Sequence, residues 1–207
     1  LPTRLKYNIK NALEGIKDTE NIELEVKIRD PNKDKNIPLL ENKLVEDGYL
    51  LEICDSIDFY NGDDRITYKD NNFFITSKKK IIEPKFLKNN HDIKITLVKE
   101  LLEKTEEPKV FTFTRNKNRK SYTKHNFSID ITRVKTVNKN TQKIEENLEL
   151  EIEVINIKEF NFEHLENLIE YIFDILFCDN DVTKSFTRAL GRESDNLKEV
   201  FIQKLEI

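Results

Sequence analysis

The sequence is poor in the residues that build disulfides, soft-metal sites and flexible turns. Its 207 residues include no methionine, no tryptophan, four glycines, two cysteines and three histidines. Cys54 and Cys178 lie far apart, which excludes a CxxC metal or redox motif. No apolar run approaches the length of a membrane span, and the first residues lack the apolar core of a signal peptide. These absences predict a soluble protein of a reducing, intracellular compartment, with no membrane partner.

Charge, by contrast, is abundant. Hydrophobic residues make up 37% of the chain and charged residues 36%, so a modest core must carry a large polar surface. Thirteen phenylalanines nevertheless favour a folded chain over a disordered one. The net charge of −4 gives no global nucleic-acid signature, so what matters is how the 35 basic residues are distributed. The length fits a single domain, residues 1–207, and a start at Leu1 without any methionine predicts that the natural start of the protein is missing.

The clearest local pattern is a strict alternation of apolar and acidic residues around Glu151. Its period of two is that of a β-strand, which places Glu149, Glu151 and Glu153 on one face. A second such stretch near the start of the chain carries Glu23 and Glu25. Carboxylates about 7 Å apart along one strand face repel one another unless water or a cation lies between them. Two glutamate ladders therefore predict either a solvated sheet face or a cation site.

Similar alternation recurs along the whole chain. Eight strands are expected, around 21–29, 56–60, 65–69, 73–82, 92–98, 110–115, 127–134 and 148–154. Apolar residues at helical spacing predict helices at 4–17, 39–45, 162–177 and 194–205. We therefore expect a mainly β (α+β) fold, in which an antiparallel eight-stranded β-barrel packs against flanking helices.

The sequence allows two assignments of the barrel faces. In an ordinary small barrel the apolar residues fill the interior and the charged residues face water. Here the middle strands carry basic residues at the same period as the glutamates, with Lys78 and Lys80 on one face and Arg115, Lys117 and Arg119 on another. If these faces point inward, the barrel encloses a tunnel of carboxylates opposite cations, and amphipathic helices must cover its apolar exterior. If they point outward, both glutamate ladders are simply solvated.

Paired motifs in a fixed order resemble the signature of the triphosphate tunnel metalloenzymes. The motifs are Glu23-x-Glu25-x-Lys27, Asp92-x-Lys94-x-Thr96 with Glu100, Arg115-x-Lys117-x-Arg119-x-Ser121, Ser128-x-Asp130-x-Thr132 and Glu149-x-Glu151-x-Glu153. The resemblance covers roughly residues 20–155. Within that family, the chain most resembles the metal-dependent RNA 5′-triphosphatases of fungal, protozoan and large-DNA-virus mRNA capping systems. The Lys-, Asn- and Ile-rich composition favours the giant-virus branch, as in mimivirus-like capping enzymes.

The resemblance implies that the chain hydrolyses the γ-phosphate of triphosphate-ended RNA to leave a diphosphate end, the first step of mRNA capping. Metal-dependent hydrolysis of free nucleoside triphosphates is the implied second activity. Covalently linked guanylyltransferase and methyltransferase modules are the expected partners, and the resemblance implies that this chain is the N-terminal module of such a larger capping enzyme. In a viral setting the activity is expected in the host cytoplasm or the virion.

The implied site consists of glutamates that hold a metal ion and basic residues that hold phosphate. Carboxylate oxygens are hard ligands that suit Mg²⁺ or Mn²⁺. The implied metal ligands are Glu23, Glu25, Glu151 and Glu153. The implied phosphate ligands are Lys27, Arg65, Lys80, Lys94, Arg115, Lys117 and Arg119, with Asp130 and Thr132 in supporting positions. Glu100 or Glu149 would orient the attacking water.

Two positions depart from the family pattern. Ser128 stands where the family usually has arginine, and Lys94 replaces an arginine, which keeps the charge but loses the bidentate fork.

Two other functions stay open. A tunnel enzyme acting on tripolyphosphate or thiamine triphosphate shares Glu-x-Glu-x-Lys, and a non-catalytic phosphate- or RNA-binding barrel would use the same basic ladders. Dependence on a divalent metal separates the binding barrel from the enzymes.

Overall fold

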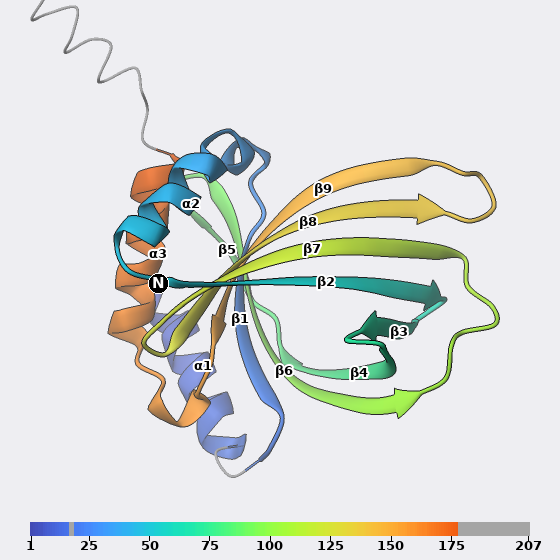
Figure 1. Ribbon diagram of the computed structural model, residues 1–207. Coiled ribbons are helices and arrows are strands. Elements are labelled where there is room, and N and C mark those ends of the chain that lie inside the picture. Colours follow the sequence, from blue (N-terminus) through green and yellow to red (C-terminus); the bar gives the residue numbers. More distant parts are fainter. Residues whose placement is uncertain (17–18, 178–207) are drawn as a thin grey trace, which may run out of the picture.

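The computed structural model describes residues 1–16 and 19–177, in which three helices form a layer on one side of a strand barrel (Figure 1). The helices are α1 (Thr3–Ile16), α2 (Ile37–Glu46) and α3 (Phe162–Leu176), with the short 3-10 helices η1 (Pro31–Asn36) and η2 (Ile157–Glu159). The strands are β1 (Ile22–Ile28), β2 (Leu50–Asn61), β3 (Asp64–Lys69), β4 (Asn72–Ile82), β5 (Lys85–Lys88), β6 (His91–Thr105), β7 (Phe113–Lys124), β8 (Phe127–Asn138) and β9 (Ile144–Val154). The helix predicted at 194–205 lies outside the described residues.

Eight of the strands close into an antiparallel barrel, which confirms the predicted fold. Their order around the barrel is β1, β9, β8, β7, β2, β3, β4 and β6, and the ring closes because β6 also pairs with β1. The ninth strand, β5, is a short addition that pairs only with the first residues of β6. The expected strands are all present, but β2, β6, β8 and β9 are longer than their alternation predicted. The strand expected at 110–115 begins three residues later and ends nine residues later, as β7.

Asparagine and aspartate make the tight turns that glycine would otherwise supply. Asp70 and Asn71, with φ of 49° and 60°, connect β3 to β4, and Asn89 and Asn90, with φ of 49° and 67°, connect β5 to β6. Two successive residues in the left-handed region form the turn whose twist suits a two-residue hairpin. Short polar side chains tolerate this conformation better than other non-glycine residues do. The chain can therefore fold into hairpins with only four glycines.

We call the end of the barrel away from the helices, at the right of Figure 1, the mouth. Three connections meet there: the β2–β3 turn, the β6–β7 loop at 106–112, and the β8–β9 loop. Two hydrogen bonds join them, because the Thr112 amide donates to the Tyr60 carbonyl at 2.8 Å and the Lys139 amide donates to the Thr112 carbonyl at 2.9 Å. The rim of the mouth is thus a connected structure rather than three separate loops.

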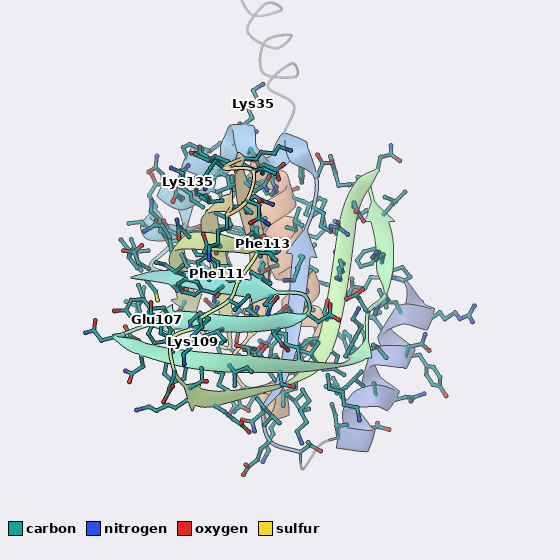
Figure 2. The ribbon with its side chains drawn as sticks, turned by 90° about the vertical axis from the view of Figure 1, so that its right-hand side faces the viewer. Lys35, Glu107, Lys109, Phe111, Phe113 and Lys135 are labelled. Carbon is teal, nitrogen blue, oxygen red and sulfur yellow. The ribbon has the colours of Figure 1, made fainter. Side chains whose placement is uncertain are left out.

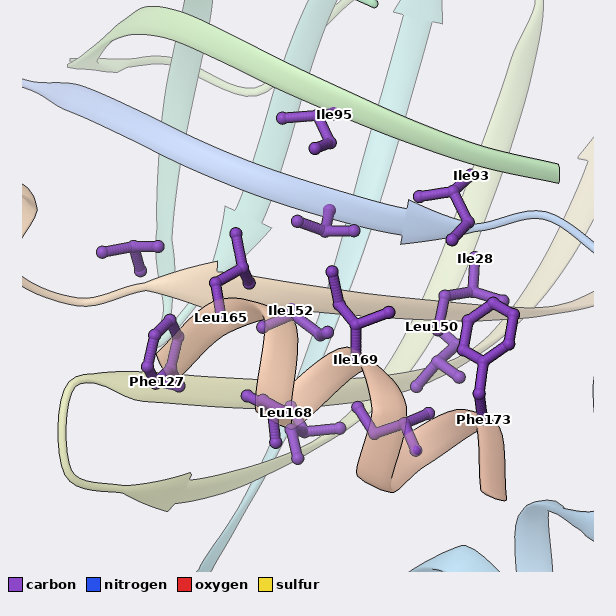
Figure 3. Packing of buried hydrophobic residues seen from close by; sticks show 14 of the residues in the cluster. Ile28, Ile93, Ile95, Phe127, Leu150, Ile152, Leu165, Leu168, Ile169 and Phe173 are labelled. Carbon is purple, nitrogen blue, oxygen red and sulfur yellow. The ribbon is translucent and has the colours of Figure 1, made fainter. Parts of the chain in front are cut away.

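The hydrophobic core lies between the outside of the barrel and the helices. Ile28, Ile93 and Ile152 come from three different strands, and all three are almost fully buried. Figure 3 shows α3 packed across these strands, with Leu165 and Ile169 directed toward them. Burying a side chain of this size stabilises the fold by about 1.5–3 kcal/mol. The apolar rows of the strands therefore face outward, as the tunnel assignment requires.

Helix α3 has the features that this position demands. Six residues at helical spacing are buried on one face: Leu165, Leu168, Ile169, Ile172, Phe173 and Leu176. Its first turn is capped by Asn161, whose side chain accepts a hydrogen bond from the Glu163 amide at 2.8 Å. Across residues 1–16 and 19–177, no helix has both the length and the apolar character needed to cross a membrane.

Candidate active site

A charged cavity of about 310 Å³ lies inside the barrel. It is lined by seven carboxylates, Glu23, Glu25, Glu52, Asp58, Glu100, Glu151 and Glu153. The five cations in its lining are Arg65, Lys69, Lys78, Lys117 and Arg119. Most of these residues belong to the inward rows of β1, β2, β7 and β9. On β1 and β9 the inward rows alternate with outward apolar residues. The charged rows thus point inward, and the alternative of two solvated glutamate ladders is wrong.

The two glutamate ladders meet at the seam between β1 and β9. Glu25 lies directly opposite Glu153 in the register of this antiparallel pair, and Lys27 lies opposite Glu151. The Lys27 ammonium bridges the two ladders, at 2.5 Å from Glu151 and 3.4 Å from Glu25. Strands that are more than 120 residues apart in sequence therefore bring their carboxylates together, as predicted for the metal-binding residues.

Lys78 of β4 occupies the centre of the carboxylate group. Its ammonium lies 3.2 Å from Glu23, 3.1 Å from Glu25 and 2.6 Å from Glu100. Burial by itself lowers the pKa of Lys78, but the negative charges of Glu25, Glu100 and Glu23 outweigh it and raise that pKa above its usual range. Lys78 is therefore held as a cation among three carboxylates.

Several of these carboxylates are crowded enough to change their titration. Burial, followed by repulsion from Glu23, Asp130 and Glu25, raises the pKa of Glu153 to about 7. Burial also raises the pKa of Glu23. Glu25 behaves in the opposite way, because its contacts with Lys27 and Lys78 overcome burial and lower its pKa. The group thus has more negative charge than its neighbouring lysines neutralise.

Each cation of the β7 ladder has its own carboxylate partner. The Arg119 guanidinium lies 3.4 Å from Asp130 of β8, and Lys117 forms an ion pair with Asp58 of β2. Asp58 is 1% exposed, and the Thr67 hydroxyl donates a hydrogen bond to it at 2.7 Å. Such partners hold the ladder cations in place before any ligand arrives.

Arg115 and Glu149 pair with each other farther toward the mouth. Neither lines the cavity, so the structure separates this pair from Arg119 and Lys117. Burial opposes the charge of Arg115, but Glu149 and the Tyr60 hydroxyl raise its pKa. Of the two glutamates predicted to orient water, Glu100 is therefore the one in the cavity.

Glu100 stands at the meeting point of β4 and β6. It is opposite Lys78 in the register of these strands, and Arg65 of β3 approaches it to 3.9 Å. Its side chain is only 12% exposed. Two cations thus flank one largely buried carboxylate that faces the cavity.

Two predicted phosphate ligands are placed elsewhere. Lys80 and Lys94 both bind Glu83, at 2.9 Å and 2.6 Å, and neither lines the cavity. Lys80 follows Lys78 on the same face of β4 and lies opposite Val98, and the register of the β4–β6 ladder shifts directly after it. Hydrogen bonds from Lys94 and Lys80 lower the pKa of Glu83 to about 2. This cluster is a separate group of ion pairs.

The remaining predicted side chains support the cavity wall. Asp130 accepts a hydrogen bond from the Ser128 hydroxyl at 2.6 Å, and Thr132, 1% exposed, has no hydrogen-bond partner for its hydroxyl. Ser128 thus orients Asp130 toward Arg119, although it does not replace the missing arginine charge.

Sequence reasoning missed Lys78 and Asp58 as members of the site. Both had a signal, since Lys78 shares a face with Lys80, and Asp58 lies in a strand of alternating polar residues. Their roles depend on the pairing of β4 with β6 and of β2 with β7, which no local pattern reveals.

The donor chemistry of the cavity fits a hard divalent cation. Its wall carries oxygen ligands in excess over cations, and Glu153 and Glu23 are destabilised as anions by their neighbours. In the part of the chain that is described, no three His, Cys, Asp or Glu side chains converge closely enough to form a ready metal site. Lys27 and Lys78 instead lie between the carboxylates.

The chain is thus a closed antiparallel barrel with carboxylates and cations on its inner wall. Residues 77–168 match the family described as mRNA capping enzyme, beta chain. The predicted resemblance to the mRNA-capping RNA triphosphatases is thereby confirmed. No curated protein sequence matches the chain significantly.

Solved structures of RNA triphosphatases share the fold. The Schizosaccharomyces pombe Pct1 RNA triphosphatase superposes with a TM-score of 0.66 at 18% identity, covering 85% of this chain and 93% of that one. The RNA triphosphatase domain of a trifunctional mimivirus mRNA capping enzyme gives a TM-score of 0.64 at 20% identity, covering 85% and 97%. Pct1 in complex with the Spt5 CTD gives 0.59 at 19% identity, covering 92% and 94%.

Proposed function

We propose that this chain is a divalent-metal-dependent RNA 5′-triphosphatase that releases the γ-phosphate of triphosphate-ended RNA as the first step of mRNA capping. The observation that carries the proposal is the charged cavity enclosed by the barrel, with four of its seven carboxylates on the paired strands β1 and β9 and its five cations on β3, β4 and β7. The match of residues 77–168 to the capping-enzyme family supports the choice of RNA as substrate.

Charge balance supports the metal dependence. The cavity lining carries seven carboxylates and five cations, a formal excess of two negative charges. A triphosphate end adds about four more, so binding it without a further cation would be strongly repulsive. Glu23, Glu25, Glu151 and Glu153 are the proposed ligands of Mg²⁺ or Mn²⁺. When bound, such an ion supplies Lewis-acid polarisation of a phosphate oxygen.

Residues of the chain itself hold the phosphate. Arg65, Lys117 and Arg119 reach the cavity from β3 and β7, so cations surround the polyphosphate on more than one side. Asp58 and Asp130 keep two of these cations oriented. Pre-oriented donors stabilise charge that develops on the phosphate oxygens in the transition state. Lys78, now bound by three carboxylates, is freed to contact phosphate once the carboxylates have another cation.

Glu100 is the proposed residue that orients the attacking water. It faces the cavity between Lys78 and Arg65, which lie close enough to direct both the phosphate and the water. A carboxylate in this position accepts a hydrogen bond from water and fixes its direction in line with the leaving diphosphate. Glu149, which is bound to Arg115 outside the cavity, is the weaker candidate.

The reaction would leave a 5′-diphosphate RNA and inorganic phosphate. Free nucleoside triphosphates present the same polyphosphate and are proposed as second substrates. One similar structure is the triphosphatase domain of a trifunctional mimivirus enzyme, and we propose that this chain likewise works with linked guanylyltransferase and methyltransferase modules, as the single domain 1–207 of a larger capping enzyme.

The deciding experiment measures γ-phosphate release from triphosphate-ended RNA with and without Mg²⁺ or Mn²⁺. The native chain should release phosphate only with metal, and Glu23→Ala should abolish the release while circular dichroism shows an intact fold. Release from tripolyphosphate or thiamine triphosphate but not from RNA would move the chain to another branch of the tunnel fold. RNA binding without any phosphate release would identify a non-catalytic barrel and overturn the proposal.

A further inference from the structure

Two aromatic rings stack on each other at the mouth of the barrel. The ring centroids of Tyr60, at the end of β2, and Phe113, at the start of β7, lie 4.6 Å apart with an interplanar angle of 9°. The two residues are directly opposite in the β2–β7 register. Both rings are partly exposed to solvent. Figure 2 faces this end of the barrel, with Phe113 and Phe111 on its rim above Lys109. We name Tyr60 and Phe113 the rim pair.

The rim pair continues the inward rows that line the cavity. On β2 the cavity-lining residues include Ser56 and Asp58, and Tyr60 is the next residue on that face. On β7 the inward row runs from Arg119 through Lys117 and Arg115 to Phe113, because the β2–β7 register has no irregularity. Alternate residues of a strand share a face. The two rings therefore extend the charged inner wall outward as an aromatic surface.

Polyphosphate-binding residues lie next to these rings. Tyr60 is opposite Arg65 in the β2–β3 register, and the Arg65 guanidinium lies 3.9 Å from Glu100. Phe113 is two residues from Arg115, about 7 Å along the strand. A ligand whose phosphates lie against Arg65 and Glu100 and whose remainder leaves through the mouth must pass the rim pair.

Other aromatic rings of the mouth have a structural role. Phe59 packs against Phe73 and Phe111, at centroid distances of 6.3 Å and 5.1 Å, and Tyr68 packs against Phe73 at 4.8 Å. Phe59, Tyr68 and Phe73 belong to the outward rows of β2, β3 and β4. They join the strands from outside, whereas Tyr60 and Phe113 project to the inner side.

We infer that the rim pair is a stacking site for a nucleobase close to the 5′ end of the RNA substrate. This inference rests on the proposed function and adds a determinant of substrate class to it. Aromatic side chains bind single-stranded nucleic acid by stacking on the bases without selecting sequence. Lys139, whose ammonium lies 4.3 Å from the Phe111 ring centroid, and the exposed Lys109 place positive charge beside the path of the RNA backbone. The rim pair thus favours a triphosphate that carries RNA over bare polyphosphate.

Steady-state kinetics on two substrates tests the inference. The KM for a short triphosphate-ended RNA should rise about tenfold in Tyr60→Ala and in Phe113→Ala, as expected for the loss of one base stack. Inorganic tripolyphosphate has no base, so its KM as substrate, or its inhibition constant against RNA, should stay within twofold. Tyr60→Phe keeps the ring and loses only the hydroxyl that hydrogen-bonds Arg115, which does not line the cavity, so its KM for RNA should stay native.

Tyr68→Ala is the matched control. It removes the same side chain from the outward face of the neighbouring strand, so the KM for RNA should not change. A KM for RNA that stays native in both rim variants overturns the inference, and so does an equal loss with RNA and tripolyphosphate, because a merely structural role moves both. A native chain that releases no phosphate from RNA refutes the proposed function instead.

Discussion

The two faces of the barrel strands are made from the same segments but hold opposite chemistry. On β9, Glu151 faces a charged cavity, whereas Leu150 and Ile152 are buried against the helix layer. An ordinary small barrel has its core inside, and here the core is outside. A structure that must keep its interior polar has to obtain its stability elsewhere, and helices α1, α2 and α3 provide the apolar cover. Function and stability are therefore assigned to alternate residues, and substitutions can separate them.

The largest expected effect comes from a single inward carboxylate. Glu25→Gln removes a proposed metal ligand, which contributes several kcal/mol of transition-state stabilisation through the ion. We expect kcat for phosphate release to fall by about a hundredfold or more. The thermal midpoint should change much less, because no apolar packing is lost. Full metal-dependent activity in a folded Glu25→Gln protein would refute the assignment of the inner face.

The neighbouring outward face should give the opposite result. Ile152→Ala leaves a cavity in the core beneath α3, where Ile152 is fully buried. Large-to-small substitutions of this kind cost about 2–5 kcal/mol of unfolding free energy. Urea denaturation should show a lower midpoint, while kcat measured on the folded protein stays near native. An unchanged midpoint would mean that the core is not where the structure places it.

A comparison of two lysines of β4 tests which of them contacts the substrate in the cavity. Lys78→Met removes the cation that contacts three cavity carboxylates, and we expect a loss of activity of about 10–100-fold, since the phosphate loses one charged ligand. Lys80→Met removes only a partner of Glu83, so activity should stay within twofold. Equal losses in the two variants would show that both lysines reach the substrate.

The smallest effect is a dependence of stability on pH at Glu83, which does not line the cavity. Lys94 and Lys80 lower the pKa of Glu83 from 4.5 to about 2. A carboxyl group with a lowered pKa contributes stability above its unfolded pKa and loses it as the pH falls toward its folded pKa. Glu83→Gln should therefore cost less than about 1 kcal/mol at pH 7. The difference in unfolding free energy between the native protein and Glu83→Gln should disappear between pH 4.5 and 2 in acid denaturation. A difference that does not depend on pH would contradict the ion pairs.

The sequence predicted most of the fold because its patterns are local. The alternation around Glu151 and the helical spacing from Leu165 to Leu176 each show directly which residues share one face of their element. The ends of the strands were predicted less accurately, because β2 and β6 extend through stretches without regular alternation. β5 was missed because four residues are too short to show a period.

The site was predicted in part, and the residues that were missed or misplaced depend on strand pairing, which alternation along one strand does not reveal. Glu23, Glu25, Glu151 and Glu153 were found because each lies in a regular ladder, and the structure brings them together. Their role as metal ligands stays a prediction. Lys80 and Lys78 differ by one period on the same strand, so the sequence could not tell which of them reaches the cavity.

By itself, the sequence determined which residues share a face, because side-chain direction in a strand or helix follows from its period. It also determined the excess of carboxylates that suits a hard cation. Only the tertiary structure decided which face is inside, since closure through β1 and β6 makes one side of every strand interior. The register shift after Lys80 and the pairing of Lys78 with Glu100 likewise depend on contacts between segments distant in the chain. Such contacts are set by long-range pairing energies, which no local pattern contains.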